Sequence, residues 1–291
     1  MTSEKKGFIY TIIATTSWGI SGVLGDYLLN SQSITPSILT SFRMIPAGIL
    51  LLLLSYGKDG HLHIDLLKKK NFITLYSFAV LGLVAIQFAF LMAIKYTNGG
   101  TATVLQYLGP IFVLLFLCIR EKRLPRFFEG FALALAFIGT YYLATQGNIK
   151  HLVLDPKGLF FGLIAALCTV VYVLAPQRLL AEHGTIPVIG WGMLLGGITF
   201  TLLANPFSQS FHLTLSGWFF VFLLVILGTV LPYGLYLEGV RLIGAVKTSM
   251  LAAIEPVSAV LFSAIFLGTS FHKMELLGIL LIILAVYVIE K

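Results

Sequence analysis

Long runs of apolar residues with almost no charge dominate this chain. One of them, SMLAAIEPVSAVLFSAIFLG at 249–268, holds a single carboxylate. A helix of about 20 apolar residues spans the hydrocarbon core of a bilayer. Only 11% of the 291 residues are charged, against about 25% in a soluble domain, so this chain has too little polar surface to face water on all sides. The pattern predicts an all-α polytopic membrane protein whose main partner is the lipid bilayer.

Ten such runs are separated by polar or Gly/Pro breaks. They lie at about 8–29, 36–56, 72–94, 99–119, 127–146, 158–177, 186–204, 216–238, 244–268 and 274–289. The first run follows a basic start, as in a signal peptide, but no clear small-residue cleavage site follows it, which favours a first span.

The basic residues predict the orientation of these spans. With the amino terminus inside, cytoplasmic segments hold fourteen of the 19 Lys and Arg residues, and outer segments hold four. Positive charge collects in cytoplasmic loops. We therefore expect both termini in the cytoplasm and the chain in the cell (inner) membrane. The same topology accounts for the net charge of +7, so we expect no nucleic-acid partner.

The two halves of the chain resemble each other. Seven positions in the third to fifth spans recur 146 residues later. The pairs are Gly82/Gly228, Lys95/Arg241, Leu105/Leu251, Pro110/Pro256, Phe116/Phe262, Glu129/Glu275 and Tyr141/Tyr287. Each half holds five spans, an odd number, so the two copies cross the membrane in opposite directions. We expect an inverted 5+5 repeat, with one copy at 1–150 and the other at 151–291.

The whole chain resembles the drug/metabolite transporter superfamily, in its ten-helix EamA-type branch. The likeness rests on four segments. They are TTSWGISGVLGDYLL in the first span, SFRMIPAGILLLLL in the second, AIKYTNGGTATVLQYLGPIFVLL at 93–115, and EGVRLIGAVKTSMLAAIEPVSAVLFSAIFLG at 238–268. The resemblance implies a carrier of small organic solutes such as amino acids, other metabolites or drugs. It leaves the substrate open.

Glu255 is the carboxylate of the run at 249–268. It lies 11 residues after Gly244. At about 1.5 Å per residue this is roughly 16 Å deep, near the middle of a core of about 30 Å. An ionised group there costs about 2.5–3.5 kcal/mol, so it needs a partner, water or a proton. We expect Glu255 to bind substrate or to couple transport to protons. The alternatives are a buried structural pair with Arg43 and an interfacial position.

Two prolines at matching positions predict helix breaks. Pro256 frees the carbonyl of Ala252, and Pro110 frees that of Gln106 in the matching helix. A free carbonyl in lipid must be satisfied by protein or cavity water. Both helices are therefore predicted to line a cavity. Weaker candidates for kinks are Pro46, Pro176 and Pro232.

The other candidate substrate-binding residues are polar or aromatic side chains inside spans. Arg43, about seven residues into the second span, binds a substrate carboxylate bidentately, neutralises Glu255 as a structural pair, or snorkels to the membrane interface. The remaining candidates are Trp18, Tyr107, Tyr172, Tyr233, Tyr236, Gln87 and Gln106. Apolar walls with a few polar anchors are typical of small-molecule sites. For each aromatic side chain, packing in the core or against lipid is the alternative.

These features predict a secondary-active transporter of a small amphipathic metabolite, such as an amino acid, working by alternating access and exporting its substrate. The direction follows from the resemblance alone. The alternative is an uptake carrier for an organic cation, held by Glu255 and aromatic residues. A membrane-embedded enzyme ranks below both, since the six histidines lie in predicted loops without metal-ligand spacing. We expect no cofactor, no metal site and no catalytic residue, and a monomer or homodimer.

Overall fold

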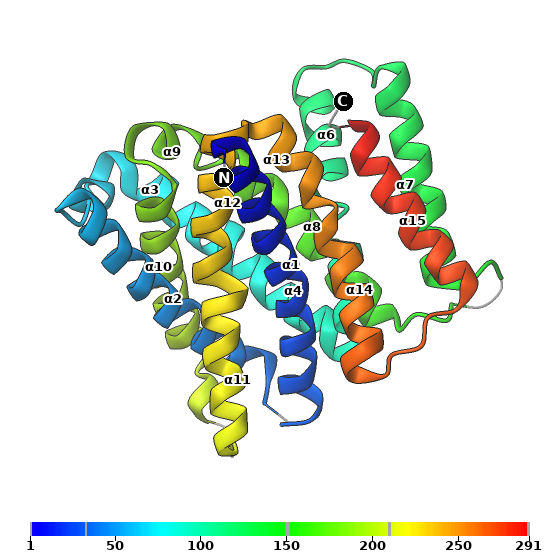
Figure 1. Ribbon diagram of the computed structural model, residues 1–291, viewed down its shortest axis with the longest axis horizontal. Helices are drawn as coiled ribbons and strands as arrows, with labels where there is room; N and C mark the ends of the chain where they lie inside the picture. Colours follow the sequence, from blue (N-terminus) through cyan, green and yellow to red (C-terminus); the bar gives the residue numbers. More distant parts are fainter. Residues whose placement is uncertain (1, 33, 149–151, 209–210, 290–291) are drawn as a thin grey trace.

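The protein is a bundle of helices, and its described part contains no strand (Figure 1). The computed structural model describes residues 2–32, 34–148, 152–208 and 211–289. The first half holds α1 (Ser3–Asn30), α2 (Pro36–Asp59), η1 (Ile64–Leu67), α3 (Lys69–Ser77), η2 (Phe78–Val84), α4 (Ala85–Tyr96), α5 (Gly99–Gln106), α6 (Gly109–Arg120) and α7 (Phe127–Thr145). The second holds α8 (Pro156–Leu174), α9 (Gln177–His183), α10 (Thr185–Ala204), η3 (Pro206–Ser208), α11 (Leu215–Val225), η4 (Ile226–Val230), α12 (Leu231–Ile243), α13 (Ala245–Ala252), α14 (Ile254–Leu267) and α15 (Lys273–Ile289).

Nine helical segments within the described ranges are long and apolar enough to cross a membrane. They are Ser3–Asn30, Pro36–Asp59, Lys69–Tyr96, Gly99–Arg120, Phe127–Thr145, Pro156–Leu174, Thr185–Ala204, Leu215–Ile243 and Met250–Leu267. The tenth predicted span, 274–289, coincides with α15, which has 17 residues. The prediction of an all-α polytopic membrane protein is confirmed. The count of ten spans and the cytoplasmic side of the termini stay predictions.

Local sequence determines where these helices begin and end, as α2 illustrates. The Thr35 hydroxyl accepts a hydrogen bond from the Ile38 amide at 3.4 Å, and Pro36 occupies the first turn. Gly60 ends the helix in the left-handed region, with φ of 73°. Pro46, a predicted candidate for a kink, lies inside α2, which continues from Pro36 to Asp59 as one helix.

The helices pack in pairs that the sequence duplication relates to each other. α7 packs along α15 and α2 along α10, at opposite sides of Figure 1. Between them α1 contacts α12 and α14, and α8 contacts α4 and α6. In the repeat α1 corresponds to α8, α12 to α4 and α14 to α6. The contacts of α1 are therefore equivalent to those of α8. Two-fold-related halves would pack in this way, while the division at 1–150 and 151–291 and the inverted orientation stay predictions.

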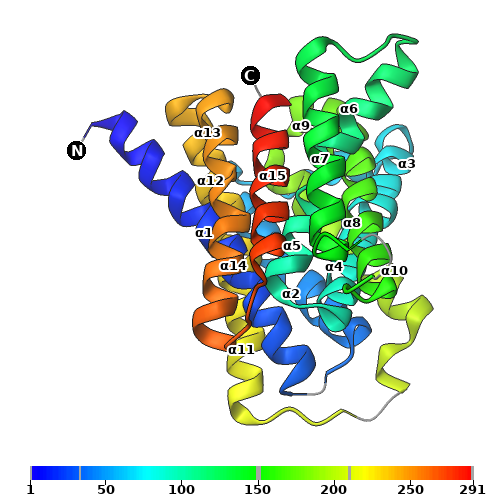
Figure 2. The ribbon, with the colours of Figure 1, turned by 90° about the vertical axis from the view of Figure 1, so that its right-hand side faces the viewer.

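Both ends of the described chain lie at one end of the bundle. α1 begins and α15 ends at the top of Figure 1, and the view turned by 90° in Figure 2 agrees. The start of α11 and the end of α14 lie at the opposite end (Figure 2). An even number of membrane crossings, such as the predicted ten, would place the two termini in this way.

The contact between α7 and α15 depends on two glycines that face each other. A Cβ atom at Gly139 would lie 2.8 Å from the carbonyl oxygen of Gly278, and one at Gly278 would lie 2.6 Å from the carbonyl oxygen of Gly139. Both distances are shorter than van der Waals contact, so a methyl group must push the helices apart. Small residues let membrane helices approach closely in this way.

We therefore expect Gly139→Ala to destabilise the protein. Overpacking a tight contact costs about 1–3 kcal/mol. The matched control is Gly130→Ala on the same helix, where a Cβ would meet nothing within 4 Å. Thermal unfolding in detergent should show a lower midpoint for Gly139→Ala and an unchanged or higher one for Gly130→Ala. Equal midpoints would contradict the packing described here.

Candidate functional site

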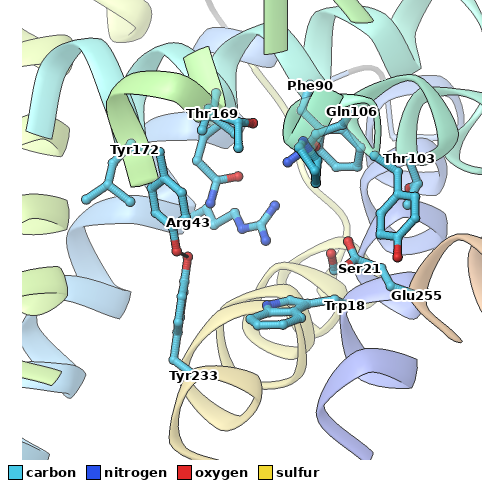
Figure 3. A pocket seen from close by; sticks show the side chains of 15 residues that line it. Trp18, Ser21, Arg43, Phe90, Thr103, Gln106, Thr169, Tyr172, Tyr233 and Glu255 are labelled. Carbon is cyan, nitrogen blue, oxygen red and sulfur yellow. Dashed lines mark hydrogen bonds between the residues drawn. The ribbon is translucent and has the colours of Figure 1, made fainter. Parts of the chain in front are cut away.

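A cavity of about 230 Å³ lies between helices of both halves (Figure 3). Eight of the nine candidate substrate-binding residues line it: Trp18, Arg43, Gln87, Gln106, Tyr107, Tyr172, Tyr233 and Glu255. The predicted helix-break residue Pro110 lines it as well. Pro256 and Tyr236 are not among the lining residues. Side chains far apart in the sequence therefore meet around one small space.

Seven helices contribute the polar and aromatic groups of this cavity. The groups are Trp18 and Ser21 on α1, Arg43 on α2, Gln87 on α4, Thr103 and Gln106 on α5, Thr169 and Tyr172 on α8, and Tyr233 on α12. Tyr107 follows the end of α5, and Glu255 lies on α14. Leu83, Ile86, Phe90 and Pro110 supply apolar wall. Apolar walls with a few polar anchors fit a small-molecule site.

Two helix breaks lie beside the cavity. α5 ends at Gln106 and α6 begins at Gly109, with Pro110 in its first turn. In the second half, α13 ends at Ala252 and α14 begins at Ile254. The breaks thus lie two or three residues before Pro110 and Pro256, because a proline fits the first turn of the new helix.

The second break places Glu255 in the first turn of α14. The positive end of a helix dipole favours a negative charge there by about 0.3–1 kcal/mol. α1 approaches this turn closely, since a Cβ at Gly19 would lie 2.8 Å from the carbonyl oxygen of Glu255. Ser258 donates a hydrogen bond to the same carbonyl at 2.9 Å. The backbone around Glu255 is therefore fixed, and its partly buried side chain faces the cavity.

Arg43 is buried, with 5% of its surface exposed. Its Nε donates to Thr229 Oγ1 at 3.0 Å, and its Nη2 donates to the carbonyl oxygen of Gly228 at 2.9 Å. Its Nη1 has no hydrogen-bond partner in the described part of the chain. No salt bridge joins Arg43 to Glu255 among the described residues, although both side chains line the same cavity. In this structure Arg43 therefore lacks the structural ion pair that the sequence left open.

Two π-helical segments interrupt long helices of the bundle: η2 lies between α3 and α4, and η4 lies between α11 and α12. They occupy equivalent positions in the two halves, since η2 contains Gly82 and η4 contains its repeat partner Gly228. Such segments are rare and frequently lie at functional sites. Apart from the matched glycines at 82 and 228, nothing in the sequence indicates them.

Aromatic side chains from three helices meet on one side of the cavity. The Tyr172 hydroxyl donates to that of Tyr233 at 3.4 Å and so joins α8 to α12 (Figure 3). Trp18 packs edge-on against Tyr233, with ring centroids 5.5 Å apart. It also packs against Tyr236 at 5.2 Å. Tyr236, a predicted candidate outside the cavity lining, therefore contacts Trp18, which lines the cavity.

Several lining residues are absent from the predictions. They are Ser21, Leu83, Ile86, Phe90, Thr103 and Thr169. Small hydroxyl and apolar side chains are common throughout membrane helices, so nothing in the sequence distinguishes these six from their neighbours.

Two further buried carboxylates lie outside this cavity. Asp26 accepts hydrogen bonds from the Gly99 amide at 2.8 Å and from the Asn30 side chain at 2.6 Å. Glu275 accepts one from the Thr101 hydroxyl at 3.1 Å. Both carboxylates thus fix the start of α5. Asp26 is not among the predicted residues.

The chain matches the EamA-like transporter family twice, at residues 5–145 and at 156–290. An uncharacterized inner membrane transporter, YicL of Salmonella typhimurium, is 36% identical over 294 residues, which cover 100% of this chain and 97% of that protein. The threonine/homoserine exporter RhtA of Escherichia coli K12 is 29% identical over 202 residues, which cover 68% of this chain and 64% of that protein.

A solved structure supports the fold. It is 17% identical, with a TM-score of 0.62 over 98% of this chain and 95% of that chain. At this identity the likeness concerns the fold alone. The family match, the apolar spans and the inner-membrane relative agree with one another. The chain is thus a multi-pass transporter of the inner membrane that belongs to the EamA-like transporter family.

Proposed function

We propose that this transporter exports a small zwitterionic metabolite, an amino acid or a close relative, by alternating access. The observation that carries the proposal is that two side chains of opposite charge, Arg43 and Glu255, line one small cavity. Arg43 offers an unpartnered Nη1, and Glu255 offers a carboxylate. A guanidinium suits a substrate carboxylate, and a carboxylate suits a substrate ammonium group.

The size of the cavity supports a small substrate. Its volume of about 230 Å³ lies below the roughly 300–1,000 Å³ typical of sites for drug-sized ligands. The aromatic rings of Trp18, Tyr172 and Tyr233 provide apolar contact for an aliphatic side chain. Export is supported by the relative RhtA, whose name states that it exports threonine and homoserine.

Glu255 also gives the carrier a means of proton coupling. A carboxylate that faces a cavity within a membrane can hold either a proton or the ammonium group of the substrate. Competition between the two would link the outward movement of substrate to the inward movement of a proton. This coupling, and a monomeric or homodimeric state, remain parts of the proposal.

Ligand-induced stabilisation of the purified protein tests the substrate class. We expect threonine, homoserine or another small amino acid to raise the thermal midpoint. Its carboxamide and its N-acetyl derivative should not, because each lacks one charge. At 100 times Kd the ligand would add about 2.7 kcal/mol to the free energy of unfolding. Loss of stabilisation with both derivatives would show that both charges are needed.

The second candidate function is uptake of an organic cation by Glu255 and the aromatic side chains. Trp18 and Tyr233 lie in edge contact beside the cavity, and a cation over such rings gains cation–π energy. In the same assay a quaternary ammonium ion would then raise the midpoint and amino acids would not. That result would overturn the zwitterion proposal. Transport into inverted vesicles, compared with right-side-out vesicles, gives the direction.

A further inference from the structure

The π-helical segment η4 contains a carbonyl group that lacks its usual donor. In a regular α-helix the Gly228 carbonyl would accept from the amide four residues later, which belongs to Pro232. Proline has no N–H, so this bond cannot form. A carbonyl within the hydrocarbon region must find another donor. Arg43 Nη2 supplies it at 2.9 Å, from a helix of the other half.

The neighbouring residue binds the same edge of the guanidinium. Thr229 is fully buried, and its hydroxyl accepts from Arg43 Nε at 3.0 Å. A guanidinium is planar, with five N–H donors in fixed directions. Two bonds on the edge formed by Nε and Nη2 therefore fix its plane and rotation. The direction of the remaining nitrogen, Nη1, is therefore fixed as well.

The guanidinium of Arg43 reaches the cavity. Figure 3 shows it extending into the space among the labelled side chains. Nη1 is buried and has no hydrogen-bond partner in the described ranges. The two acceptors that Arg43 does have are a hydroxyl and a carbonyl, which are both uncharged. A substrate carboxylate would supply the missing acceptor and the missing negative charge together.

We propose that Thr229 and the Gly228 carbonyl position Arg43, and that through it they select substrates with a carboxylate over substrates with a carboxamide. The inference rests on the proposed function, because it assigns the carboxylate end of the zwitterion to Arg43. Thr229 and Gly228 are positioning groups that act through Arg43 without touching the substrate. The π-helical segment η4 in the second half thus orients Arg43 of the first half, and through this orientation it determines the preference of Arg43 for a carboxylate.

The test compares Thr229→Val with Thr229→Ser. The valine keeps the branched shape and removes the acceptor, whereas the serine keeps the hydroxyl. The readout is the ratio of Kd values for an amino acid that stabilises the native protein and for its carboxamide. We expect Thr229→Ser to keep the native ratio. Thr229→Val should weaken amino-acid binding by about tenfold and weaken carboxamide binding much less, since the neutral amide oxygen is a weaker acceptor for the oriented Nη1 than a carboxylate is.

Thr15→Val is the matched control. Thr15 is also fully buried, but its hydroxyl bonds the Thr11 carbonyl of its own helix at 3.0 Å, and it does not line the cavity. If Thr229→Val does not fold, Pro232→Ala provides a second variant. The alanine restores an amide that competes with Arg43 for the Gly228 carbonyl, so the preference for the carboxylate should fall here too.

The outcomes separate this inference from the proposed function. If the native protein binds the amino acid no better than its carboxamide, the zwitterion proposal is wrong. If the native protein discriminates and both Thr229→Val and Pro232→Ala keep the ratio, the proposed function stands and the positioning role is overturned. Equal weakening of both ligands in Thr229→Val would indicate a purely structural role and would also overturn it.

Discussion

Glu255→Gln is expected to abolish transport of the substrate, although the protein should still fold and insert. The glutamine keeps the size of the side chain and its ability to form hydrogen bonds. It cannot carry a negative charge to the substrate ammonium group or exchange a proton. A hydrogen bond to a charged group contributes about 1.5–3 kcal/mol, which corresponds to roughly 10- to 150-fold in binding. Transport into proteoliposomes, measured across a range of pH and with an imposed pH gradient, gives the readout.

Glu238→Gln is the control for this change. Glu238 lies on α12, outside the cavity lining, and forms an exposed ion pair with Arg241. An exposed pair contributes about 0–1 kcal/mol, so transport should stay near the native rate. Native rates for Glu255→Gln at every pH would remove Glu255 from the mechanism. A normal rate that no longer responds to pH would separate proton coupling from substrate binding.

Replacing Arg43 should produce the second large effect. Arg43→Ala removes the donor for Thr229 and Gly228 as well as the free Nη1. Buried acceptors left without a donor cost about 1–3 kcal/mol each. We therefore expect a lower thermal midpoint together with loss of amino-acid binding. Arg43→Lys should not restore binding, because an ammonium group cannot form two bonds along one planar edge and present a third donor.

The Arg43→Ala/Glu255→Ala double variant tests whether the two charges form a structural pair. If they did, removing both would recover the stability that Arg43→Ala loses, since neither charge would remain uncompensated. The structure places the bonds of Arg43 on Thr229 and Gly228, so we expect no recovery. A double-mutant cycle on the free energy of unfolding measures this coupling directly. Recovery to the native value would restore the structural-pair interpretation.

Hydropathy was enough to predict the helical class and the approximate positions of the helices. A bilayer forces long charge-free segments on any chain that crosses it, and the loops must carry the charge. The candidates for the cavity lining were predicted from the exceptions to this apolar pattern. A glutamate, an arginine or a glutamine at depth costs free energy unless it faces a polar space, so Glu255, Arg43 and Gln87 were visible as exceptions.

The finer features depend on contacts between segments far apart in the chain, which no local pattern records. The partner of Arg43 is a case: Gly228 lies 185 residues away and acts through its backbone carbonyl, which every residue possesses. The π-helical segments arise from a shift of one residue in backbone hydrogen bonding, and ordinary apolar sequence tolerates it. The break before Glu255 falls at Ala253, three residues ahead of Pro256, because the proline belongs to the first turn of the next helix.

The bond between Arg43 and η4 also imposes an order on biosynthesis. Arg43 is synthesised 185 residues before Gly228. At about 5–20 residues per second, roughly 10–40 s pass before its acceptors exist. During that interval the guanidinium, in the first third of α2, has neither acceptor, and an arginine at the centre of a bilayer costs about 2.5–3.5 kcal/mol. We therefore expect the second span to reach its final depth only after the second half of the chain has entered the membrane.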